Sequence, residues 1–151
     1  MTETKELYYL DSHIREFSSM VDRCRPNGDY WEVVLEETAF FPGGGGQDCD
    51  LGTIGDARVL DVDVPGSYVV HYCDRPVEVG SEPVCRIDWD RRFDLMQQHT
   101  GEHMVSGVIH RRYGYHNTGF HMGSDVITID FDGPVPADAL AEIEREANEK
   151  I

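Results

Sequence analysis

Two histidines stand four residues apart in the segment "MQQHTGEHMVSG", at positions 99 and 103. On a helix, residues with this spacing are neighbours on one face, so His99 and His103 can each offer a ring nitrogen to one metal ion. Zinc binds imidazole nitrogen at about 2.0–2.1 Å but takes at least three protein ligands. The pair therefore predicts half of a metal site. The plain alternative is two partly buried, hydrogen-bonded histidines.

Glu102 precedes His103 and completes the pattern H-x-x-E-H. In inverted zinc peptidases, which share this pattern, Glu102 would be the general base and an acidic side chain on a later helix the third ligand. Several glutamates follow within residues 142–149, but such a row is usually the solvated face of an amphipathic helix. We keep a zinc peptidase as one hypothesis, with a solvent-exposed Glu102 as its alternative.

Four consecutive glycines, Gly43, Gly44, Gly45 and Gly46, lie in the segment "FFPGGGGQD". Consecutive glycines adopt unusual backbone dihedrals and allow a ligand to approach the chain closely. Their amide groups can also form an anion-binding nest. Because no Lys-Ser or Lys-Thr follows, this is not a Walker phosphate loop. We expect a loop that contacts a ligand, with an ordinary turn as the alternative.

Residues 1–88 are rich in β-forming residues and turn signals, which predicts short strands in a small barrel or sandwich. Expected strands cover residues 29–37, 57–64, 67–73 and 82–89. A hairpin turn is expected at "PGS" (65–67). Within 57–64, odd- and even-numbered residues are expected to face opposite sides of the sheet.

A long helix is expected next, with Asp90 as N-cap and Gly114 as its stop. One stripe of this helix carries residues spaced by three and four, namely Phe93, Met96, Thr100, His103 and Gly107. A strand at 124–133 and a second helix from Pro136 follow, and the helical pattern continues to Ile151 without a stop signal. We therefore expect an α+β protein with a β-barrel-like part at 1–88. The metal-bearing α/β part at 89–151 is expected to be incomplete at its C-terminus.

The chain is strongly acidic, with 29 acidic and 13 basic residues among 151 and a net charge of −16. This charge favours solubility and does not favour broad electrostatic capture of nucleic acid. It fits a halophilic source or an acidic mesophilic enzyme. Apolar runs are too short for a membrane span, the first residues lack a secretory signal pattern, and four cysteines form no C-x-x-C pair. We therefore expect a cytoplasmic protein with reduced thiols and no membrane partner.

Several motifs occur in order along the chain: "TAFFPGGGGQ", "DLGTI", "DWDRRFDLMQQHTGEH" and "TGFHMGSDVITIDF". Together they resemble the alanyl-tRNA editing proteins (AlaX) and the editing domain of alanyl-tRNA synthetases, from about residue 7 to the end. The resemblance implies a β-barrel-like part with the glycine loop and an α/β part with the metal. It also implies hydrolysis of the ester of tRNA(Ala) mischarged with serine and, in some members, with glycine.

The same resemblance implies roles for individual residues. His99 and His103 match the family's zinc ligands, and one Zn²⁺ per chain is expected. A later C-x-x-x-H motif completes the site in the family, but this sequence contains none, which suggests a truncated chain. Thr38 and Gln47 match the Thr and Gln that flank the glycine loop, and we expect them to be catalytic.

Substrate-binding residues are also implied. The glycine loop is expected to hold the terminal adenosine or its phosphate at the acceptor end of the tRNA. Gln98 and His121 are expected near the substrate, with helix surface and a strand edge as their alternatives. The arginines at 91–92 and 111–112 are expected to touch phosphates, with helix-end salt bridges as the alternative. A non-catalytic RNA-binding fragment is the third functional hypothesis.

Overall fold

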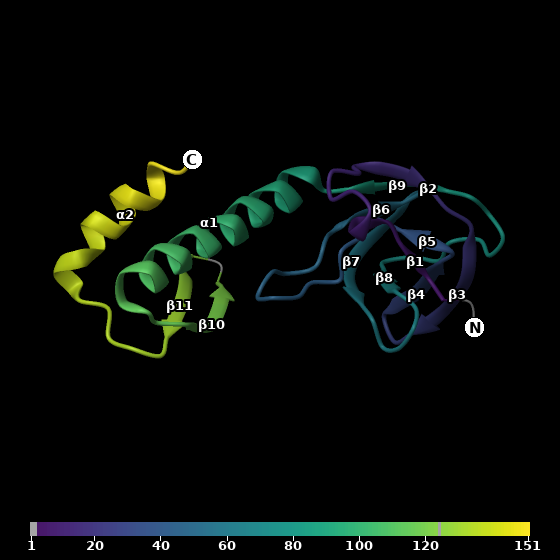
Figure 1. Cartoon of the computed structure of the whole chain (residues 1–151). Helices are drawn as coiled ribbons and strands as arrows, with labels where there is room; N and C mark the ends of the chain where they lie inside the picture. The colour runs from purple at the N-terminus through teal and green to yellow at the C-terminus, as the bar shows by residue number, and fades with distance from the viewer. Residues whose placement is uncertain (1–2, 124) are drawn as a thin grey trace. The chain divides into compact units, whose positions relative to one another are not determined.

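The computed structural model describes residues 3–123 and 125–151. The chain forms two compact units, whose elements are labelled in Figure 1. The first unit runs to Gly44 and resumes with Asp48–Phe93, and the second comprises Gly45–Gln47 and Asp94–Ile151. Gly45 and Gly46 of the glycine loop, together with Gln47, therefore pack with the second unit. The expected domain boundary between residues 88 and 89 stays a prediction.

The first unit contains a seven-stranded sheet in which all neighbouring strands are antiparallel. The strand order is β2-β9-β6-β7-β8-β4-β3. The strands are β2 (Glu16–Ser18), β3 (Val21–Asn27), β4 (Tyr30–Leu35), β6 (Gly52–Ile54), β7 (Ala57–Asp63), β8 (Val70–Cys73) and β9 (Val84–Ile87). A parallel pair joins β1 (Lys5–Glu6) to β5 (Glu37–Thr38), and the 3₁₀ turn η1 spans Leu7–Tyr9.

The predicted α+β class is confirmed, but across the described residues the sheet is not closed into a barrel. The strands β2 and β3 form its two edges. Because β2 has three residues, all in register with β9, it is the kind of short edge strand with which natural sheets end. The expected β-barrel-like part is therefore an open antiparallel sheet.

Each of the four predicted strands contains an observed one, and the β7–β8 hairpin is confirmed. The simple alternation expected in β7 is wrong. Val59 and Val62 are both buried whereas Leu60 is exposed, because the register against β8 shifts between Val59 and Asp61. Such a bulge adds one residue and switches the inward face of the strand.

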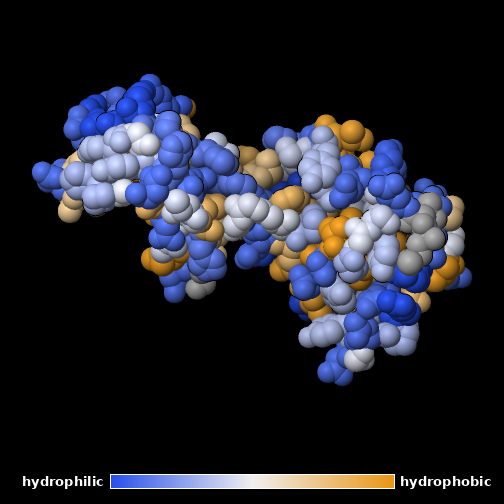
Figure 2. All heavy atoms as spheres, turned by 60° about the horizontal axis from the view of Figure 1, so that its bottom comes forward, coloured by the Kyte–Doolittle hydropathy of each residue, from blue (hydrophilic) through white to orange (hydrophobic). Residues whose placement is uncertain are grey.

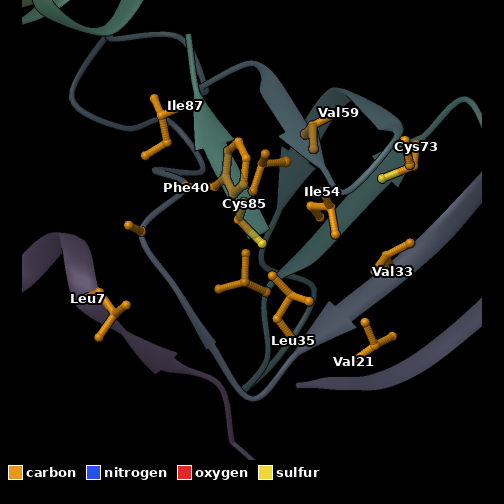
Figure 3. Packing of buried hydrophobic residues seen from close by; sticks show 14 residues of the cluster. Leu7, Val21, Val33, Leu35, Phe40, Ile54, Val59, Cys73, Cys85 and Ile87 are labelled. Atoms are coloured by element: carbon orange, nitrogen blue, oxygen red, sulfur yellow. The ribbon is translucent and has the colours of Figure 1, made fainter. Parts of the chain in front are cut away.

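The core of the first unit gathers residues from most of these strands, as Figure 3 shows. Leu35 from β4, Ile54 from β6 and Phe40 from the segment before the glycine loop are almost completely buried. Burying each of these side chains stabilises the fold by about 1.5–3 kcal/mol relative to exposure. The glycine loop therefore leaves from a segment that is anchored in the core.

A buried ion pair joins three segments of the first unit. The side chains of Arg92 and Asp50 are 3% and 0% exposed, and the Arg92 Nε donates to Asp50 Oδ1 over 2.8 Å. The same guanidinium donates to the carbonyl oxygens of Ser12 and Ala39 over 2.8 and 2.7 Å. Asp50 also accepts the Phe41 amide over 2.6 Å. The expectation that Arg92 touches phosphate is wrong, because its charge is enclosed and fully partnered.

The long helix α1 (Trp89–Tyr113) is confirmed, but its predicted N-cap is wrong. Asp88 rather than Asp90 precedes the helix, and its Oδ1 accepts the Arg91 amide over 3.3 Å. Gly114 ends the helix as predicted, with a φ of 74° that favours glycine. The predicted stripe does not form the buried face, since Phe93, Thr100, His103 and Gly107 are exposed. The buried positions of α1 are Arg92, Leu95, Glu102, Val108 and Ile109.

The second unit packs α1 with a hairpin and a short helix. The hairpin joins β10 (Asn117–Met122) to β11 (Ile127–Phe131), and the 3₁₀ turn η2 (Ala137–Ala139) precedes α2 (Leu140–Asn148). The predicted strand at 124–133 is confirmed over β11, while Ser124 lies outside the described residues. The expected helix from 136 to the chain end is too long. It ends at Asn148, whose side-chain Nδ2 donates to the Glu144 carbonyl over 2.9 Å.

Figure 2 shows a face covered mainly by hydrophilic residues, with apolar atoms in scattered patches, as the acidic composition suggests. Among the described residues, no helix combines the length and apolarity needed to cross a bilayer.

We predict that Arg92→Met destabilises the first unit by about 3–5 kcal/mol, because it leaves Asp50 charged, buried and without its cation. Urea unfolding of the purified protein measures this loss. The matched control is Arg86→Met, which breaks an ion pair with Glu16 in which both side chains are 59% exposed. That variant should lose no more than about 1 kcal/mol. Equal losses in the two variants would contradict the role assigned to Arg92.

Candidate metal centre and glycine loop

The helix α1 brings His99, Glu102 and His103 together. The two imidazole rings stack with centroids 5.0 Å apart and an angle of 18° between their planes. Ligand atoms of all three side chains lie within 4.8 Å of one another. The predicted four-residue spacing therefore does place both histidines on one face. This group could hold a metal ion.

Each histidine has an oxygen acceptor facing its Nδ1 atom. His99 Nδ1 lies 3.0 Å from Gln47 Oε1, and His103 Nδ1 lies 3.4 Å from Glu102 Oε2. An amide oxygen only accepts hydrogen bonds, so the His99 ring is favoured in the tautomer with the proton on Nδ1. The negative charge of the Glu102 carboxylate beside His103 Nδ1 favours the same tautomer of His103. The Nε2 lone pairs of both rings then remain as ligands, the usual arrangement around zinc-binding histidines.

Glu102 is buried rather than solvent-exposed. Its Oε1 atom accepts hydrogen bonds from Ser106 Oγ and from Asn117 Nδ2, each over 2.5 Å. Its other oxygen faces His103. A general base needs an oxygen free to reach a proton on the attacking water. Both oxygens of this carboxylate are engaged, which disfavours the general-base role that a peptidase requires.

Gly45 and Gly46 lie against His99 and Phe120 within the second unit. All four glycines have a positive φ, from 59° to 148°. A Cβ at Gly45 would lie 3.3 Å from His99 Cε1, and one at Gly46 would lie 2.5 Å from Phe120 Cδ1 and 2.8 Å from the Phe120 carbonyl. Only glycine fits Gly46 without displacing β10. The predicted contact of this loop with a ligand stays a prediction, and the structure shows why its backbone can come so close to His99.

Gln47, predicted as a catalytic residue, follows the glycines and is buried. Its Oε1 atom faces His99 Nδ1, so Gln47 is placed to orient that ring. Thr38, the other predicted catalytic residue, is fully buried in the first unit. Its hydroxyl lies 2.8 Å from His71 Nε2 and accepts the Phe40 amide over 3.2 Å. The catalytic roles of both residues stay predictions.

The predicted substrate residues Gln98 and His121 both belong to the second unit. Gln98 donates to Asp94 Oδ2 over 2.6 Å along the surface of α1. His121 is exposed on β10 and follows Phe120, so its side chain leaves the opposite face of that strand. Because Phe120 is the residue that faces Gly46, His121 points away from the glycine loop. Substrate binding by either residue stays a prediction.

The remaining basic residues expected at phosphates form ion pairs at the ends of α1. Arg91 Nη2 lies 3.5 Å from Asp48 Oδ2, and its Nε donates to the Cys49 carbonyl over 3.3 Å. Arg112 lies 2.9 Å from Glu146 and 3.1 Å from Glu142, and Arg111 also pairs with Glu146. These contacts match the alternative of helix-end salt bridges.

The four cysteines are all free thiols, as expected. Burial raises the pKa of the Cys73 and Cys85 thiols to about 12. They therefore stay protonated at neutral pH and behave as core residues.

Sequence reasoning missed the partners of Glu102. Ser106 lies one helical turn after Glu102, so the i, i+4 spacing could have indicated that contact. Asn117 reaches Glu102 from β10, which was not predicted as a strand, and no local signal pointed to it.

No family model matches this sequence, but individual known proteins do. The alanyl-tRNA editing protein Aarsd1 of Bos taurus is 42% identical over 93% of this chain, which corresponds to 35% of that protein. This chain is a relative of the alanyl-tRNA editing proteins. The Aarsd1 protein of Rattus norvegicus is 40% identical over 93% of the chain and 38% of its own length. The alanine–tRNA ligase of Pyrobaculum neutrophilum is 38% identical over the whole chain and 18% of its own length.

The resemblance inferred from the motifs is thus confirmed. The chain spans about a third of the length of these animal editing proteins. Its similarity to both editing proteins and ligases concerns the stretch that carries the glycine loop and the histidine pair.

We predict that Gly46→Ala destabilises the second unit more than a positive φ alone explains, because the new Cβ meets Phe120 at 2.5 Å. Gly28→Ala is the matched control: its φ is 60° and its Cβ would meet nothing within 4 Å. The control should lose about 1 kcal/mol and Gly46→Ala about 1–3 kcal/mol more, measured by thermal unfolding. A loss at Gly46 no larger than at Gly28 would show that the loop does not pack on β10.

A second prediction concerns His71 and pH. Burial lowers the pKa of His71 from 6.5 to about 4, so the ring is neutral in the folded protein. As the pH falls from 6.5 towards 4, the unfolded chain takes up a proton at this residue and the folded one does not. The neutral, buried His71 therefore contributes to the free energy of unfolding above pH 6.5, and this contribution is lost as the pH falls from 6.5 towards 4. A shift of this size corresponds to roughly 3 kcal/mol.

Urea unfolding at pH 7 and pH 4.5 measures this effect. His71→Gln should flatten the pH dependence relative to the unsubstituted protein. The exposed histidine variant His13→Gln should keep the original slope. An unchanged slope in His71→Gln would contradict the neutral, buried state of His71.

Proposed function

We propose that this chain contributes to the hydrolysis of the aminoacyl ester of tRNA(Ala) mischarged with serine, with Gly-tRNA(Ala) as the second substrate to test. The observation that carries the proposal is the pair His99 and His103, whose Nε2 atoms are left as ligands beside the glycine loop. The animal relatives with which the chain shares 40–42% identity are named alanyl-tRNA editing proteins.

The donor set at this group fits Zn²⁺. Two neutral imidazoles are ligands that zinc prefers, and both have an acceptor on Nδ1 that fixes the ring. His99 and His103 would hold the ion through Nε2, and further ligands are needed beyond the two histidines. When bound, zinc supplies a Lewis acid that polarises an ester carbonyl or lowers the pKa of a water molecule. The C-x-x-x-H motif implied by the family is absent from this sequence.

The chain's own residues would position the substrate. Amides of the glycine loop would bind the terminal adenosine or its phosphate, since residues without a side chain let a ligand approach the backbone closely. Gln47 would keep the His99 ring oriented through Nδ1. Thr38 would act from the core, because its hydroxyl bridges His71 and the Phe40 amide and so fixes the strand end that precedes the loop.

Recognition of the amino acid follows from general specificity arguments. A synthetase pocket rejects an added hydroxyl weakly, so serine is the expected error for an alanine enzyme. A second site that grips the hydroxyl can remove this error. The partner is therefore the acceptor end of mischarged tRNA(Ala), and we place the reaction in the cytoplasm. With a net charge of −16, contact with RNA is confined to this end.

The peptidase alternative has less support. Its general base would be Glu102, whose oxygens are engaged by Ser106, Asn117 and His103. A deacylation assay distinguishes the non-catalytic RNA-binding alternative from the proposed hydrolase, because that alternative predicts binding of the tRNA without release of serine.

We predict that the purified chain, supplied with Zn²⁺, deacylates Ser-tRNA(Ala) faster than the spontaneous reaction and leaves Ala-tRNA(Ala) intact. His99→Ala removes a metal ligand and should lower the deacylation rate at least about 100-fold. His110→Ala changes an exposed histidine of the same helix and should stay within twofold of the unsubstituted protein. The measurement is release of labelled serine over time.

Two outcomes would contradict the proposal. Binding of Ser-tRNA(Ala) without release of serine would favour the non-catalytic alternative. Hydrolysis that survives His99→Ala would show that the reaction does not use the histidine pair.

A further inference from the structure

Glu102 is a buried carboxylate that accepts hydrogen bonds from two neighbouring side chains. Its side chain is 3% exposed, and a carboxylate in such a place must be hydrogen-bonded to be tolerated. Ser106, one turn later on α1, and Asn117, the first residue of β10, both donate to Oε1 over 2.5 Å. Asn117 also lies 3.3 Å from the Ser106 hydroxyl. Two donors from two elements therefore fix the plane of this carboxylate.

The second oxygen of Glu102 is directed to His103. Oε2 lies 3.4 Å from His103 Nδ1, while the His103 side chain is 72% exposed. Packing restrains so exposed a ring only weakly, and a free side chain loses rotamer entropy when it binds a metal. A fixed negative charge beside Nδ1 reduces that loss, and it favours the tautomer whose Nε2 carries the lone pair.

We infer that Glu102 is a positioning residue that orients the His103 imidazole for metal binding, rather than a metal ligand or a general base. The two nitrogens of an imidazole point away from each other, so a carboxylate oxygen that faces Nδ1 of His103 cannot also bind an ion held by Nε2 of the same ring. The inference rests on the proposed metal site, and it assigns Ser106 and Asn117 to the support of that carboxylate.

His99, the other histidine of the pair, also has an oxygen atom facing its Nδ1. His99 Nδ1 is faced by Gln47 Oε1 at 3.0 Å. One histidine is thus oriented from the end of the glycine loop and the other from its own helix. A pair of independent acceptors predicts that the two positioning residues act separately on the two rings.

The test is the Zn²⁺ affinity of the whole chain, measured by competition with a chromophoric chelator. Glu102→Gln should weaken it about 10- to 100-fold, the usual effect of removing an outer partner of a ligand. The Gln amide oxygen can still accept from Ser106 and Asn117, which directs its NH₂ group at His103. An NH₂ group beside His103 favours the tautomer in which Nδ1 accepts and Nε2 carries the proton. The Nε2 lone pair is then no longer available to the metal ion. The absorption bands of bound Co²⁺ report whether the coordination of the ion changes.

Controls separate this effect from unfolding. Glu144→Gln removes the same charge from an exposed position on α2 and should bind Zn²⁺ within twofold of the unsubstituted chain. Thermal unfolding in the presence of a chelator should be similar for both variants. If Glu102→Gln does not fold, Ser106→Ala decides: it keeps the carboxylate, removes one of its two donors and should weaken Zn²⁺ binding several-fold.

The outcomes distinguish this inference from the proposed function. Wild-type affinity in Glu102→Gln, or in Ser106→Ala where that variant decides, would overturn the role of Glu102 and leave the metal site standing. If the unsubstituted chain does not bind Zn²⁺, or if His99→Ala binds it equally well, the proposed metal site fails and this inference fails with it.

Discussion

The ion pair between Arg92 and Asp50 is the constraint on which the arrangement around the glycine loop depends. One guanidinium contacts the carbonyl of Ser12, the carbonyl of Ala39 and the carboxylate of Asp50. Asp50 in turn binds the Phe41 amide. Both flanks of the glycine loop are therefore tied to the first turn of α1. A buried ion pair adds little net stability compared with a well-packed apolar pair. The pair instead fixes the geometry of this region, because Arg92 and Asp50 form hydrogen bonds with backbone groups of separate segments.

The candidate metal group of the second unit depends on a different set of contacts, an oxygen atom facing Nδ1 of each histidine. Metal-binding histidines are useful only when the lone pair faces the ion, and each ring has two tautomers. Here a loop amide and a helix carboxylate supply the two acceptors. The Gly45 backbone reaches the His99 ring because it carries no Cβ. The glycine loop therefore has a structural reason for its composition that is independent of any ligand.

The parts of the structure that the sequence predicted correctly are those with local signals. The four-residue spacing of His99 and His103 and the stop at Gly114 follow from helix geometry alone, and both are confirmed. The strand pattern of β7 was recognised, but its inward face was not, because a bulge depends on the partner strand. Residue type alone also suggested solvent or phosphate for two charged side chains of α1. Arg92 and Glu102 are instead buried, since their partners come from distant segments such as Asp50 and Asn117.

The charge distribution bears on how the proposed tRNA substrate would be attracted. Arg92 is enclosed by Asp50, and Arg111 and Arg112 are paired with acidic residues of α2. In a chain of net charge −16, these cations offset local acidity and leave little positive field for a polyanion. Amide groups of a positive-φ glycine segment carry partial positive charge without any side chain. The Gly45 backbone also lies against His99, since a Cβ at Gly45 would be 3.3 Å from the His99 Cε1 atom. We therefore expect the loop, rather than an arginine surface, to provide the attraction for a terminal nucleotide.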